Sequence, residues 1–130
     1  MSGVMLRGLK VLALASLAGL VLAPSAFAEG DPLHGKTVFA RCAGCHAISG
    51  PSFAAPALAG VVGRKAGSAP GFQYSKALVA YGKVWDDQAL DAFIAAPTKA
   101  VPGTSMPIGL DGAQDRADVI AYLKSVPAAH

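Results

Sequence analysis

Cys42-Ala43-Gly44-Cys45-His46 is the stretch on which the fold of this 130-residue chain depends. Two thiols at this spacing can add to the two vinyl groups on one edge of a haem, and the histidine that follows can reach the iron beneath the ring; C-x-x-C-H is an attachment motif for c-type haem. The sequence has only these two cysteines, so neither thiol has another partner. We predict one haem c, bound through Cys42 and Cys45, with His46 as an iron ligand.

Two other uses of the cysteine pair are open. C-x-x-C also forms thiol–disulfide redox pairs, but those belong to a βαβ context that this sequence lacks. A structural zinc site usually takes four ligands, and only His34 and His130 could complete one. His34 falls on an expected helix and His130 ends the sequence, so we interpret both as solvated side chains.

Residues 1–28 have the three parts of a secretory signal peptide. Arg7 and Lys10 supply the positive start, and residues 11–23 are uncharged and mainly apolar. Ala26-Phe27-Ala28 is a small-x-small pattern that predicts cleavage after Ala28, export to the periplasm and a mature domain of residues 29–130. An uncleaved membrane anchor is the alternative, although so short an apolar stretch does not span a hydrocarbon core of ~30 Å.

Met106 is the only methionine left once residues 1–28 are removed. It lies with Pro102, Gly103 and Pro107 in an irregular stretch, which is a poor place for the core-filling role usual for a lone methionine. A thioether ligand favours the ferrous state of haem iron and so raises its reduction potential. We predict His46 and Met106 as the two protein ligands of the iron.

Composition excludes several classes of protein. Apolar residues make up 53% of the chain and charged residues 15%, which is unlike a disordered chain. The formal net charge is +3. Without Arg7 and Lys10, nine basic and eight acidic residues remain, so the mature charge is about +1. No basic patch of the kind that binds nucleic acid is visible.

The expected secondary structure is all-α. Asp31, as N-cap before Pro32, begins a helix over residues 32–43, and further helices are expected over residues 75–81 and 87–96, the last capped by Asp86 and ended by Pro97. Residues 111–114 resemble a capping box that opens a final helix. Its apolar stripe comprises Val119, Ile120, Leu123 and Val126. Two Gly- and Pro-rich stretches, residues 49–71 and 101–107, predict long loops.

Four blocks of sequence occur in an order and at distances that match a known family. They are residues 42–46 (CAGCH), 56–65 (PALAGVVGRK), 69–74 (APGFQY) and 101–106 (VPGTSM). Over residues 30–124 the chain therefore resembles a small class I cytochrome c of the mitochondrial cytochrome c and bacterial cytochrome c2 group. The resemblance implies about four short helices, with long loops wrapped around one covalently attached haem.

The resemblance also implies contacts to the haem and its ligands. Pro56 would offer its carbonyl oxygen to the ring N–H of His46, which fixes the tautomer of that ligand. A buried haem propionate needs polar donors, and the matching positions are Arg64, Tyr74 and Trp85 for one propionate and Thr104 for the other. Phe93 matches an aromatic behind the methionine ligand.

A helix crossing is implied as well. In it, Gly35 and Phe39 on the first helix meet Val119 and Tyr122 on the last, and the glycine lets the two backbones approach closely.

Some positions depart from the family pattern. Leu78 stands where an Asn is often found, and Ile108 near a common aromatic at the haem edge. Thr98, Ser105 and Pro107 are neutral where cations are expected near Met106, although Lys36, Arg41 and Lys99 remain.

The expected function is a periplasmic electron carrier that has no catalytic residue and acts as a monomer. Its partners would be redox proteins, namely a membrane oxidase, a bc1-type complex, a reaction centre or a periplasmic dehydrogenase, with no nucleic acid and with membrane contact only through those partners. The alternatives are a haem subunit of a dehydrogenase, a peroxidase-like enzyme or a gas-binding haem. A peroxidase or gas-binding site needs an open iron position, which Met106 closes.

Overall fold

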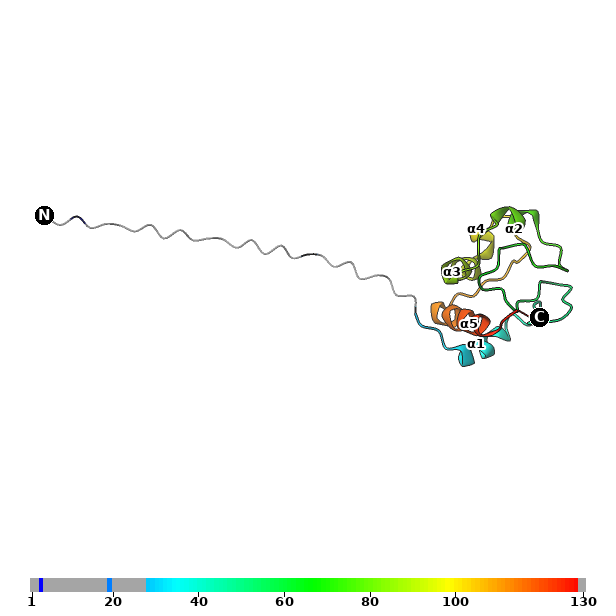
Figure 1. Cartoon of the computed structure of the whole chain (residues 1–130), viewed down its shortest axis with the longest axis horizontal. Helices are drawn as coiled ribbons and strands as arrows, with labels where there is room; N and C mark the ends of the chain where they lie inside the picture. The colour runs from blue at the N-terminus through cyan, green and yellow to red at the C-terminus, as the bar shows by residue number, and fades with distance from the viewer. Residues whose placement is uncertain (1–2, 4–18, 20–27, 129–130) are drawn as a thin grey trace.

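The computed structural model describes Gly3, Gly19 and residues 28–128, so nearly all of the predicted signal peptide, and His130, lie outside the described residues (Figure 1). Within them the chain is helical, and one isolated antiparallel bridge joins Lys65 and Val84. This confirms the all-α prediction. The helices are α1 (Pro32–Phe39), α2 (Lys76–Tyr81), α3 (Asp87–Ala95), α4 (Pro97–Ala100) and α5 (Ala113–Ser125). None of these helices has the length and apolar character needed to cross a bilayer.

Helices α1 and α5 pack together at one end of the domain, α2 and α4 lie at the other end, and α3 lies between them (Figure 1). A Cβ atom on Gly35 would overlap the carbonyl oxygen of Asp118, so only glycine allows this crossing. The rings of Phe39 and Tyr122 lie 5.6 Å apart, centroid to centroid. Val119 at the crossing is 1% exposed. The implied helix crossing is therefore present.

Short side chains cap three of the helices: Asp31 and Asp86 as predicted, and Ser75, which was expected as the first helical residue. An oxygen of Asp31 accepts the N–H of Leu33 at 2.8 Å. The Ser75 hydroxyl accepts from Leu78 N–H at 3.2 Å, and an oxygen of Asp86 accepts from Ala89 N–H at 2.7 Å. Each cap satisfies a backbone donor that has no partner within the first helical turn.

One predicted helix end is wrong, and one helix was not predicted. Helix α1 ends at Phe39 rather than at residue 43, because residues 40–45 form tight turns in which Cys42 N–H bonds Phe39 O at 2.8 Å. Pro97 ends α3 but also begins the short helix α4, since proline fits a first helical position. The structure therefore has one helix more than the four expected.

The predicted capping box is also absent. Gly112 is the N-cap of α5, and no side chain caps that helix. The amide of Gln114 instead donates to Asp118 Oδ1 at 2.9 Å and to Glu29 O at 3.4 Å.

Asp118 is the polar centre of the α1–α5 contact. It is 3% exposed, and its carboxylate also accepts the N–H of Asp31 at 2.7 Å and the Nδ1–H of His34 at 2.6 Å. His34 is exposed, as expected for a solvated side chain, but its ring is also bonded to Asp118, which the sequence did not indicate. The hydrogen bond to Asp118 raises the pKa of His34. The pKa of Asp118 is lowered, mainly by the hydrogen bond from Asp31 N–H and then by those from His34 and Gln114.

We predict that Gly35→Ala destabilises the haem-loaded protein by about 1–3 kcal/mol or more, because the added methyl forces two helix backbones apart. Denaturant unfolding followed by far-UV circular dichroism measures this. Gly44→Ala is the matched control, since a Cβ there meets nothing within 4 Å. Equal stability losses in the two variants would contradict the crossing argument.

We also predict a pH-dependent contribution from His34. The pKa of His34 is raised in the folded state, so its stabilisation is complete below the unfolded value of about 6.5 and is lost as pH rises through the folded pKa. The lowered pKa of Asp118 sets the acid limit, below which the carboxylate is protonated and the pair is lost. His34→Gln keeps a donor but does not titrate. Its stability deficit against the parent should be largest near pH 5.5 and should shrink towards pH 9; a constant deficit would show that the charge plays no part.

Candidate haem-binding site

The C-x-x-C-H motif lies in the tight turns that follow α1. Backbone bonds from Cys45 N–H at 3.1 Å and His46 N–H at 2.9 Å to the carbonyl of Cys42 hold the motif in a compact form. The Cys45 side chain is exposed and that of Cys42 is half-buried against the core. The two cysteines do not form a disulfide with each other. The motif thus presents two thiols and one imidazole from a single short segment.

Pro56 orients the imidazole of His46. The Nδ1 atom of His46 lies 2.8 Å from the carbonyl oxygen of Pro56. A carbonyl only accepts, so Nδ1 carries the proton and Nε2 keeps a free lone pair for a metal. Two backbone bonds hold the ends of the intervening loop together, from Leu58 N–H to Ala47 O at 3.0 Å and from Ala59 N–H to Ile48 O at 2.7 Å.

The electrostatics of Cys42 argue against a thiol–disulfide redox pair. Burial raises the pKa of this thiol, and the nearby charge of Arg41 opposes the shift only in part. Redox-active cysteines instead have lowered pKa values that favour the reactive thiolate. A zinc site shared with His34 has no support either, because among the described residues His34 is grouped with Asp115 and Asp118 and not with either cysteine.

Met106 follows the short turn after α4. Its side chain is partly buried and packs against the hydrophobic core. The side chain of Cys42, which is distant in sequence, packs against the same core. Its N–H donates to the hydroxyl oxygen of Thr104 at 3.3 Å, which fixes this part of the loop. Ile108, two residues on, is 70% exposed.

Arg64 and Trp85 are brought together by their backbones. Trp85 N–H bonds Arg64 O at 2.9 Å, and Gly63 N–H bonds Trp85 O at 2.8 Å. The guanidinium of Arg64 donates to the carbonyls of Ala59 at 3.3 Å and Ala57 at 3.4 Å. No sequence pattern indicated these two carbonyl partners, because any residue type could supply them.

The Trp85 ring is 6% exposed, and its centroid lies 5.0 Å from that of Phe93. No described residue accepts a hydrogen bond from its indole N–H. Since every fully buried polar side-chain atom among the described residues has a partner, this N–H must open onto accessible space. It is therefore a donor without a partner among the described residues, on a residue whose backbone is bonded to that of Arg64.

Tyr74 is placed separately from that pair. Its ring packs edge-on against Phe72 with centroids 5.0 Å apart, and no contact among the described residues joins its hydroxyl to Arg64 or Trp85.

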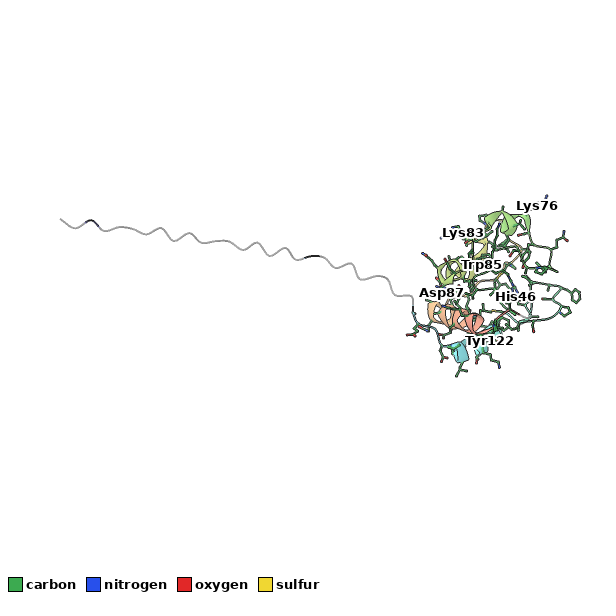
Figure 2. All side chains as sticks on the ribbon, viewed as in Figure 1. His46, Lys76, Lys83, Trp85, Asp87 and Tyr122 are labelled. Atoms are coloured by element: carbon green, nitrogen blue, oxygen red, sulfur yellow. The ribbon has the colours of Figure 1, made fainter. Side chains whose placement is uncertain are left out.

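The surroundings of these groups suit a flat, apolar cofactor with acidic edges. Half-buried apolar side chains border the core beside Cys42 and Met106; they include Ile48, Leu58, Val62, Leu78 and Ile94. A groove of about 650 Å³ is lined by Pro56, Arg64 and Phe72 together with Ile48 and Val62. Figure 2 shows His46 on the loop side of α5, with Trp85 in the interior. The donor set of two thiols, an imidazole and a thioether fits haem c.

Comparison with known proteins identifies the family. Residues 33–127 match the Cytochrome c family. The chain is 48% identical over 110 residues to cytochrome c2 of Rhodomicrobium vannielii, covering 82% of this chain and 87% of that protein. It is 51% identical over 100 residues to cytochrome c of Tetrahymena pyriformis, covering 75% and 91%. The structure of cytochrome cH from Methylobacterium extorquens matches with a TM-score of 0.71 and 42% identity, over 74% of this chain and 99% of that one.

The chain belongs to the class I cytochrome c family. It therefore has the class I cytochrome c fold and carries covalently attached haem c, and Cys42 and Cys45 have the required spacing. Members of this family transfer electrons to and from redox proteins, so the chain is an electron-transfer cytochrome rather than an enzyme.

Proposed function

We propose that this cytochrome carries one electron at a time on a haem held by His46 and Met106 as axial ligands and by thioether bonds to Cys42 and Cys45. The bond between His46 and Pro56 is the observation that carries this proposal, because it leaves Nε2 free to bind a metal. When bound, the haem supplies an iron centre that takes up or releases one electron. The carbonyl of Pro56 also increases the basicity of the histidine ligand.

Met106 would close the second axial position. The bond from its N–H to Thr104 restrains the loop that carries the thioether. The aromatic pair of Trp85 and Phe93 stiffens the core beside the site. A ligand held in place this way needs little movement when the iron changes oxidation state, which suits an electron carrier and opposes a peroxidase-like or gas-binding function.

We propose that Arg64, Tyr74 and Trp85 neutralise and bond one haem propionate, and that the hydroxyl of Thr104 bonds the other. The free indole N–H of Trp85 and its backbone pairing with Arg64 support the first assignment. A buried carboxylate requires such donors. The assignment of Tyr74 to this propionate rests on its match to the family pattern.

We propose that residues 1–28 are a signal peptide cleaved after Ala28, that residues 29–130 form the cytochrome domain and that the mature monomer works in the periplasm. The contacts of the folded domain support this boundary. Among the described residues, the first two of that domain with side-chain-mediated bonds are Glu29, whose carbonyl accepts from Gln114, and Asp31, whose N–H bonds Asp118.

The partners we propose are a membrane oxidase, a bc1-type complex, a reaction centre or a periplasmic dehydrogenase. Docking would rely on the apolar surface around Ile108, which is 70% exposed between neutral neighbours. Arg41 adds little charge there, because Asp115 lies 3.3 Å from its guanidinium.

Met106→Ala should keep the haem attached yet lower its reduction potential by a sizeable part of the ~0.8 V range that axial ligands span. Met106→His should lower it too, because imidazole stabilises ferric iron more than a thioether does. Redox titration followed by visible absorption measures both values. Potentials unchanged from the parent in both variants would show that Met106 is not a ligand.

Electron transfer to membranes of the producing organism should depend only weakly on salt. Steered association slows steeply as charges are screened, whereas apolar docking does not. We expect the second-order rate constant, from stopped-flow absorption, to fall less than about tenfold as the Debye length shrinks from ~30 to ~8 Å. A fall of about a hundredfold would instead indicate steering by Lys36, Lys65 and Lys99.

A further inference from the structure

A groove of about 480 Å³ lies where the N-terminal segment meets α3 and α5. Ala28, Glu29 and Gly30 form one wall, and Asp87 and Asp91 of α3 form another. Figure 2 shows Asp87 close to the point at which the N-terminal segment joins the domain. The groove lies on the α5 side of the molecule and shares no lining residue with the haem-binding groups described above.

The segment that forms the first wall is fixed in place. A Cβ on Gly30 would overlap the carbonyl of Ala117, so this backbone lies directly on α5. Gln114 Nε2 donates to Glu29 O at 3.4 Å, and Asp31 N–H donates to Asp118 at 2.7 Å. The backbone nitrogen of Glu29 is therefore held at the groove wall, between two residues that both line it.

The charges of the groove do not balance in the uncleaved chain. Two ion pairs cross it, from Arg116 Nε to Asp91 at 2.7 Å and from Lys124 Nζ to Asp87 at 2.8 Å. Glu29 adds a third carboxylate to these two cations. The lining thus has one negative charge in excess, and no other described residue that lines it can offset that charge.

We propose that this groove binds the α-ammonium group that cleavage after Ala28 creates on Glu29. Hydrolysis of the Ala28–Glu29 bond consumes one water, leaves a carboxylate on the departing segment and leaves an ammonium group on Glu29. That group supplies the missing positive charge beside Asp87 and Asp91. The inference rests on the cleavage proposed above. It makes processing the step that completes the ion-pair network between the N-terminus, α3 and α5.

The test compares two haem-loaded proteins whose first residues are Glu29 and Ser25, each verified by mass spectrometry; the second carries its α-amino group on a residue that is not among the described residues lining the groove. In the first, NMR titration should show the α-amino group binding its proton about two- to fivefold more tightly than in the second, as for a partly exposed ion pair. Asp87→Asn in the Glu29-start protein should remove most of this gain. Asp111→Asn removes the same charge outside the groove and should preserve the gain.

Equal proton affinity in the Glu29-start and Ser25-start proteins would overturn the groove inference alone, as would an equal loss in the Asp87 and Asp111 variants. Mass spectrometry of protein exported with its native leader tests the cleavage separately. A first residue other than Glu29 would overturn the cleavage proposal, and with it the inference, whatever the titration shows. Asp87 pairs with a half-exposed lysine, so its variant should fold, and its unchanged haem absorption would verify that.

Discussion

The close approach of α1 to α5 at Gly35 is the constraint on which the rest of the domain depends. With no side chain between the two backbones, the carbonyl of Asp118 lies against Gly35, and the Asp118 carboxylate comes within reach of Asp31 and His34. The crossing also fixes where α1 ends, and the haem-binding motif begins three residues later. A wider crossing would displace the motif and break the polar bonds around Asp118 together.

Short connections link the α1–α5 crossing to the groups that bind the haem. Tight turns after Phe39 deliver two thiols and an imidazole from one segment, and the loop closed by the Ala47 and Ile48 carbonyls returns the chain so that Pro56 meets His46. A domain of about a hundred residues buries only part of its apolar surface. An apolar cofactor among the half-buried side chains therefore adds to the core as well as supplying the redox centre.

Local chemistry made the helix starts and the cofactor predictable from sequence. The caps at Asp31, Ser75 and Asp86 depend on residues two or three positions away, and the cysteine spacing specifies the haem edge by itself. The early end of α1 and the short helix α4 were missed because turns and helix restarts depend on tertiary packing. The bonds from His34 and Gln114 to Asp118 were missed for a related reason. Asp118 is distant in sequence from His34, and it is buried by contacts that no local pattern reveals.

The bond between Asp31 and Asp118 joins positions 87 residues apart. In polymer terms it closes a ring that contains the motif, both long loops, helices α1 to α4 and the first part of α5. The entropy cost of such closure grows only with the logarithm of ring size, but every contact that needs the two ends together must wait for it. A haem bound to the motif and, as proposed above, to Met106 would divide this ring into shorter ones, because it would hold position 106 against position 46. Such a ligand would reduce the conformational search through which the two terminal helices find each other.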